Sequence, residues 1–140
     1  MTAVALIGNS YCRSSAAVKI EFFLRLGVIQ HENEDGSPCD YGGRSGGDNL
    51  ALYPKGTTLD EVVDAWMQSP HHREVIMTKD FLYAGYASGI YPESTTKLIM
   101  GPGQFNPDTG AYTTEPYEYT IPEALRGKLV CYCLRMTATE

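Results

Sequence analysis

The sequence lacks the features that mark several common classes of protein. It has no cluster of lysine and arginine, and 17 acids against 11 bases give its 140 residues a net charge of −6. We therefore expect no nucleic-acid partner. No apolar run approaches the roughly 18 residues that cross a bilayer, so no transmembrane segment is expected. The apolar opening MTAVALIG is short, has no basic region and predicts a first strand rather than a signal peptide.

Motifs for familiar catalytic and metal sites are also missing. The sequence has no CxxC pair, which disfavours a cysteine zinc site. The stretch HENED, which begins at His31, lacks the second histidine of HExxH. No serine lies in a nucleophile elbow. These absences disfavour catalysis.

The four cysteines are Cys12, Cys39, Cys131 and Cys133. Their even number permits two disulfides in three pairings. Cys131 and Cys133 lie two apart in KLVCYCLRM, which alternates like a strand, so their side chains share one face and seek different partners. An oxidised form would tie this last strand to Cys12 or Cys39. The alternative is four reduced cysteines in the core.

Length and composition indicate one globular domain over residues 1–140. An apolar fraction of 43% and a charged fraction of 20% are typical of a folded chain with a core. The 14 glycines and 8 prolines predict many tight turns.

A first, largely buried helix is predicted from Ser14 to about Gln30, where apolar residues are dense. Ser14 or Ser15 would cap it, and Glu21 and Arg25 would form an i,i+4 pair. A long polar loop, HENEDGSPCDYGGRSGG, is predicted to follow over residues 31–47.

The clearest helix signal begins at Thr58, which forms a capping box with Glu61. Leu59, Val62, Val63 and Trp66 fall on one face of this helix, which predicts that Trp66 is in the core. The helix is expected to stop at QSP. Ser69 would then cap a second, short helix with Pro70 at its first position.

After residue 79 the pattern changes to short strands, predicted over 81–91, 97–105 and 127–136. YPEST (91–95) and NPDTG (106–110) are turn signals. The stretch TTEPYEYTIPEALRG is expected to be irregular and superficial. Helices followed by strands indicate an α+β fold, with helices packed on an antiparallel sheet.

The run from GGDNLA through VVDAWMQSPHHREVI to FLYAGYASG resembles the CAP superfamily, which contains cysteine-rich secretory proteins, antigen 5, pathogenesis-related proteins and bacterial domains of the sperm-coating-protein type. The resemblance covers residues 46–87 and extends back to His31. The matching positions are His31, Gly47–Asn49, Trp66–Pro70, His72–Arg73 and Gly85.

This resemblance implies a three-layer α-β-α sandwich with a central antiparallel sheet. It also implies a cleft of histidines and acids that can hold a divalent metal such as zinc. Carried over to this sequence, the metal ligands are His31, His72 and Asp48, and Ser69 completes the cleft. Two positions depart from the family pattern, because Asp48 replaces the usual Glu and Ser69 replaces a second acid.

Each candidate residue also has an ordinary structural explanation. His72 could bond across the start of its own helix, and His31 could be an exposed loop residue. Asp48 suits an Asx turn. Ser69 could serve only as a helix cap, with its hydroxyl bonded to a backbone N–H, which argues against a Ser69–His72 nucleophile pair.

The function expected from the resemblance is a binding or interaction module in the extracellular space or at the cell surface. Its ligand would be a lipid, a sterol, a glycan or a protein. One alternative is a metal-dependent hydrolase that uses the same cleft. Another is a structural component of an extracellular assembly.

Overall fold

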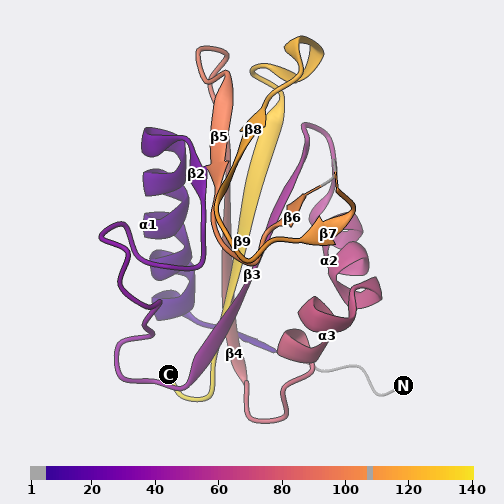
Figure 1. Ribbon diagram of the computed structural model, residues 1–140. Coiled ribbons are helices and arrows are strands. Elements are labelled where there is room, and N and C mark those ends of the chain that lie inside the picture. Colours follow the sequence, from indigo (N-terminus) through magenta and orange to yellow (C-terminus); the bar gives the residue numbers. More distant parts are fainter. Residues whose placement is uncertain (1–5, 107–108) are drawn as a thin grey trace.

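A four-stranded sheet with the strand order β1-β4-β9-β3 forms the centre of the fold (Figure 1). The computed structural model describes residues 6–106 and 109–140. β3 and β4 each pair with β9 in antiparallel fashion, whereas the short β1 runs parallel to β4. The predicted α+β class is confirmed, although this sheet is not wholly antiparallel. The strands are β1 (Ile7–Gly8), β3 (Gly46–Pro54), β4 (Tyr83–Ile90) and β9 (Leu129–Thr137).

The two faces of this sheet carry different helices. Cys131 and Cys133 of β9 pack with α1 (Ser10–Leu26) in one hydrophobic cluster, as their predicted common face requires. Tyr132 lies between them in sequence and packs instead with Trp66 in a second cluster, under α2 (Leu59–Gln68) and α3 (Pro70–Ile76). The alternation of side chains along a strand therefore separates the two cores.

The first helix begins and ends earlier than predicted. Asn9 caps it, because its side chain accepts a hydrogen bond from the Cys12 N–H at 3.0 Å. Gly27 ends it in the left-handed region with φ 67°, donating its N–H to the Phe23 carbonyl. Asn and Gly are favoured at these two positions. Ser14 and Ser15 lie inside the helix, so neither caps it.

The bounds of the two helices of the central motif match the prediction. The Thr58 hydroxyl accepts from the Glu61 N–H at 3.2 Å and contacts the Glu61 carboxylate at 3.1 Å. Trp66 is 3% exposed, and α3 begins at Pro70. Among the described residues, no helix is long and apolar enough to cross a membrane.

β3 is a nine-residue strand that the sequence does not predict, because Gly46 and Gly47 read as the end of a loop. Both glycines instead serve close packing. A Cβ on Gly46 would lie 2.4 Å from the Tyr41 ring, and one on Gly47 would lie 2.9 Å from the Phe81 ring. A side chain at either position would displace an aromatic ring.

A second sheet, of order β2-β5-β8, lies beside the first, and a hairpin of β6 and β7 adjoins it (Figure 1). The predicted strand 97–105 is interrupted, since β5 ends at Met100 and β6 begins at Phe105. These elements are β2 (Val28–Ile29), β5 (Lys97–Met100), β6 (Phe105–Asn106), β7 (Ala111–Tyr112), β8 (Tyr117–Thr120) and the 3₁₀ helix η1 (Glu123–Leu125).

The segment predicted to be irregular contains β8, and Ile121 directly after it is 1% exposed. This prediction is wrong, because pairing with β5 orders the segment. The turn predicted at 91–95 is confirmed by the hydrogen bond from the Thr95 N–H to the Pro92 carbonyl at 2.9 Å. The turn predicted at 106–110 lies partly outside the described residues, which omit 107 and 108.

Candidate functional site

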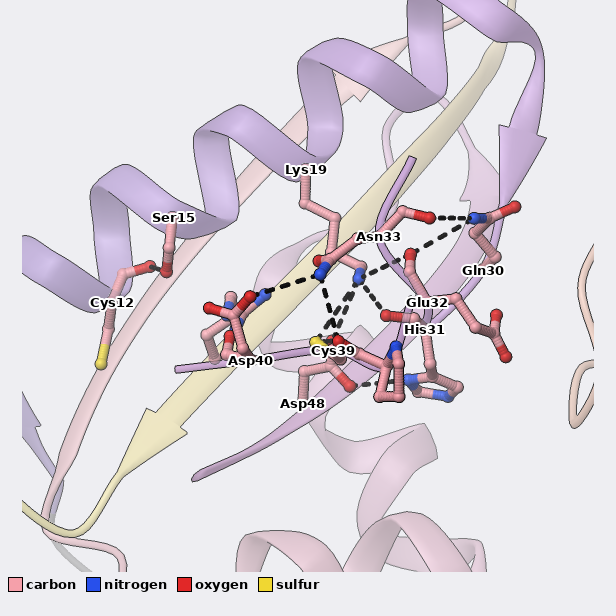
Figure 2. A network of polar contacts seen from close by, with 12 residues as sticks. Cys12, Ser15, Lys19, Gln30, His31, Glu32, Asn33, Cys39, Asp40 and Asp48 are labelled. Atoms are coloured by element: carbon pink, nitrogen blue, oxygen red, sulfur yellow. Dashed lines mark hydrogen bonds and ion pairs between the residues drawn. The ribbon is translucent and has the colours of Figure 1, made fainter. Parts of the chain in front are cut away.

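Asp48 is the centre of a buried polar cluster beneath α1 (Figure 2). Its Oδ1 lies 2.6 Å from His31 Nδ1, and its Oδ2 lies 3.8 Å from Lys19 Nζ. The Lys19 and Asp48 side chains are only 3% and 4% exposed. Lys19 also donates to the His31 carbonyl and, at 3.5 Å, to that of Glu32. A lysine of α1 thus holds the loop that carries His31 against a carboxylate of β3.

The electrostatics of this cluster keep Asp48 ionised. Burial by itself raises the pKa of the carboxyl, but the hydrogen bond to His31 and the positive charges of His31, Lys19 and Arg135 outweigh it. The net pKa lies below its ordinary value. A buried carboxylate is stable here because cationic groups surround it.

His31 is held in one orientation by this carboxylate. An ionised carboxylate can only accept hydrogen bonds, so His31 Nδ1 carries the proton and donates to Asp48. Its Nε2 is left for solvent or a ligand, and the His31 side chain is 33% exposed. Histidine and carboxylate together form a base and the group that orients it.

A second polar group forms where α3 begins. The Ser69 hydroxyl lies 3.2 Å from His72 Nδ1 and 3.2 Å from the Tyr112 hydroxyl. Ser69 occupies the N-cap position of α3, but its side chain makes no capping hydrogen bond. The prediction that a backbone N–H occupies this hydroxyl is therefore wrong, because His72 and Tyr112 take it. His71 faces solvent, as expected.

His72 favours its neutral form. Burial lowers its pKa below the ordinary value, and the charges of His71 and His31 lower it further. At neutral pH His72 can accept a hydrogen bond.

Two adjacent residues of β3 tie these groups to the central sheet. The Asp48 side chain bonds to His31, and the Asn49 amide donates to the His72 carbonyl at 3.1 Å. Neighbouring residues of a strand point to opposite faces, so each one anchors a different segment. The Gly-Asp-Asn sequence therefore lies within a strand and holds two other segments to it by hydrogen bonds. It does not form the Asx turn considered as its alternative role.

A cavity of about 390 Å³ lies between β3, the start of α3 and the second sheet. Ser69 and His72 belong to its wall, while His31 and Asp48 are not among the described residues that line it. The predicted cleft residues are thus brought together as two pairs. The wall consists of Ile29, Leu50, Ala51, Leu52, Tyr53, Ala65, Trp66, Ser69, His72, Met100, Gly103, Gln104, Phe105, Tyr112, Tyr117 and Tyr119.

The chemistry of this wall is apolar and aromatic, with a few hydrogen-bonding groups. It contains no lysine, arginine, aspartate or glutamate among the described residues. Five of its residues are tyrosine or phenylalanine, and Trp66 is also present. Apolar walls with a few convergent polar groups are typical of ligand pockets, which usually measure about 300–1,000 Å³.

The metal site predicted at His31, His72 and Asp48 stays a prediction. Across residues 6–106 and 109–140, no group of three or more His, Cys, Asp or Glu side chains could hold a metal ion. Both Asp48 oxygens are engaged, one by His31 and the other by Lys19. Asp48 is positioned as a carboxylate that orients a histidine by a hydrogen bond, and such a carboxylate does not itself bind the metal.

Two residues of the site were missed at the level of sequence. Lys19 lies within the apolar run of the first helix, where a charge flanked by apolar residues is a signal for a buried ion pair. Tyr112 lies 43 positions from Ser69, and no local pattern connects the two.

All four cysteines are free thiols in the described structure. Cys12 lies 3.4 Å from the Thr137 hydroxyl, and Cys39 lies 3.9 Å from Asp48 Oδ2. Burial raises the pKa of the Cys131 thiol to about 11, so it is protonated at neutral pH. The disulfide to the last strand stays a prediction.

Comparison with known proteins finds no matching family model, no matching curated protein and no matching solved structure.

Proposed function

We propose that this chain is a CAP-like binding module whose ligand occupies the cavity beside Ser69 and His72. The observation that carries the proposal is the composition of the wall, which is aromatic, uncharged and supplied with a few hydrogen-bonding groups. Such a wall suits an uncharged, partly apolar ligand. The His31–Asp48 pair then holds a neighbouring loop in place.

The architecture proposed with this function is the three-layer α-β-α sandwich of the CAP superfamily. In its support, α1 and the α2–α3 pair belong to separate cores on opposite faces of one sheet. The order of motifs from His31 to Gly85 also supports it. The second sheet would be an addition at the side of this sandwich.

Trp66 is the only tryptophan of the chain and borders the cavity, so its fluorescence provides the test. Four probes represent the expected classes of ligand: a fatty acid, a sterol, a disaccharide and a mixture of blocked peptides. We expect one class to change the emission. Ala65→Phe fills the cavity and should abolish the change. Gln68→Phe, on an exposed position of the same helix, is the matched control.

A metal-dependent hydrolase is the second candidate. The observation in its favour is the oriented His31, whose Nε2 is available beside a buried carboxylate. A hydrolase of this kind should lose turnover of an ester or peptide substrate on chelation or in His31→Ala. A binder should keep its ligand without metal. Elemental analysis of the purified protein tests for zinc directly.

An extracellular or cell-surface location is part of the proposal, and the acidic net charge, the many turn residues, the even number of cysteines and the resemblance support it. It predicts that the native protein has at least one disulfide, from Cys131 or Cys133 to Cys12 or Cys39. Alkylation before and after reduction, followed by intact-mass measurement, tests this. Four thiols alkylated without reductant would contradict the extracellular location and agree with the free thiols of the structure.

A further inference from the structure

β3 is an edge strand of the central sheet, so alternate backbone groups along it have no neighbouring strand. The Ala138 N–H donates to the Ser45 carbonyl at 2.9 Å, and the Lys55 N–H donates to the Lys128 carbonyl at 2.6 Å. The odd-numbered residues of β3 therefore bond to β9. The even-numbered residues, including Leu50 and Leu52, direct their N–H and C=O groups away from the sheet.

Part of this edge is already occupied by contacts from within the chain. Trp66 donates its indole N–H to the Leu50 carbonyl at 3.1 Å. Pro54, the next outward-facing position after Leu52, has no N–H, and its carbonyl accepts from Thr57 at 3.2 Å. Within the described chain, the Leu50 N–H and both backbone groups of Leu52 are left without a hydrogen-bond partner.

These backbone groups lie beside the cavity, because Leu50, Ala51, Leu52 and Tyr53 all belong to its wall. An unpaired donor and acceptor on one residue, with another donor two residues away, match the spacing of an antiparallel ladder. The complementary chemistry is that of a peptide backbone. The uncharged wall excludes a segment with charged side chains at these positions.

We propose that the edge from Leu50 to Leu52 binds an extended, uncharged peptide segment, which adds to β3 as a further antiparallel strand. This inference rests on the proposed binding function and specifies its ligand. Recognition would occur by strand addition, in which backbone hydrogen bonds provide affinity and alternate side chains provide specificity.

The antiparallel direction follows from the available groups. One peptide residue can exchange two hydrogen bonds with Leu52, donating to its carbonyl and accepting from its N–H. A second peptide residue, two positions along, accepts from the Leu50 N–H. A parallel strand would need three residues to reach the same three groups, and two of them would make only one bond, because Trp66 occupies the Leu50 carbonyl and Pro54 has no N–H.

Side-chain specificity follows from the alternation of the added strand. The peptide side chain opposite Leu52 shares the face of Leu52, which belongs to the cluster that also contains Tyr117 and Tyr119. The next side chain turns to the other face, on which Ala51 and Tyr53 pack in the cluster of Trp66. An apolar residue is expected at the first of these positions.

The test uses a mixture of tetrapeptides with acetylated N-termini and amidated C-termini, built from Ala, Val, Leu, Phe, Ser, Thr and Gln. At millimolar concentration it should change Trp66 fluorescence and shift the backbone amide resonances of Leu50 and Leu52. The best-binding peptide is then N-methylated at one position at a time. Only methylation of the residue opposite Leu52 removes its bond to the Leu52 carbonyl, and this should weaken binding roughly five- to tenfold.

Leu52→Pro removes the outward N–H of residue 52 and leaves the hydrogen bonds between β3 and β9 intact. It should therefore weaken peptide binding to a similar extent. If this variant fails to fold, the N-methylation series decides, because it needs no change in the protein. Equal effects of N-methylation at every position would overturn strand addition. If the fatty acid, sterol or disaccharide binds and no peptide does, this inference fails and the proposed function stands. If no probe binds, both fail.

Discussion

At the scale of single residues, Lys19 and Asp48 form an ion pair that is almost entirely buried, at 3.8 Å. Lys19→Met would leave the buried Asp48 carboxylate without the ammonium group that pairs with it. Removal of one member of a buried pair usually costs about 3–5 kcal/mol. We therefore expect a loss of that order in the free energy of unfolding, measured with denaturant.

Lys97→Met is the matched control for this change. Lys97 pairs with Glu118 at 2.9 Å, but both side chains are about half exposed. Solvent screens such pairs, so the expected cost is less than about 1 kcal/mol. Equal losses for the two variants would mean that burial does not strengthen the Lys19 pair.

Trp66 stabilises the fold by packing in the core and by one hydrogen bond, and two variants separate these contributions. Trp66→Ala empties a core position that is 3% exposed and should cost about 3–5 kcal/mol. Trp66→Phe keeps most of the ring but loses the bond to the Leu50 carbonyl, at a cost of about 1 kcal/mol. Circular dichroism is the appropriate measurement, since both variants lack the fluorophore. An unfolding midpoint of Trp66→Ala equal to that of the native protein would contradict this core.

At the scale of elements, the cap of α2 can be tested alone. Thr58→Ala removes the hydroxyl that accepts from the Glu61 N–H, and should lower the free energy of unfolding by about 1 kcal/mol. Ser69→Ala gives the contrast at α3. Ser69 makes no capping bond, so this change should affect His72 and the cavity more than the helix. A larger loss of helicity in Ser69→Ala than in Thr58→Ala would contradict these roles.

The elements also differ in how far local sequence specifies them. α2 has a capping box, an apolar face and a stop before Pro70, all within a dozen residues, so its bounds were predictable. β3 has no such local signal. Its glycines resemble a turn, and its extended form depends on pairing with β9, at the other end of the chain.

At the scale of the whole molecule, stability should depend on pH in two windows. The folded state lowers the pKa of His72 below its ordinary 6.5, so the neutral form is favoured and its contribution is present above pH 6.5. This contribution is lost as the pH falls through the folded value. His72→Gln should flatten the dependence between about pH 7 and 5.

The second window belongs to Asp48, whose pKa in the folded state is lowered from 3.8. Its contribution is complete above the unfolded value and is lost as the pH falls below about 4. Denaturant melts of Asp48→Asn across this range should show a smaller acid loss than those of the native protein. An unchanged slope in both variants would show that other groups dominate the pH dependence.

Local sequence patterns were sufficient to predict the α+β class, the two helices after Thr58, the buried Trp66 and the common face of Cys131 and Cys133. Each of these follows from residues close together in the chain, through capping, periodicity or alternation. No local pattern predicts that Lys19 pairs with Asp48, that Tyr112 contacts the Ser69 hydroxyl, or that β3 has an open edge beside a cavity. These features depend on contacts between distant segments, and the free energy of such contacts overrides local preference when the chain folds.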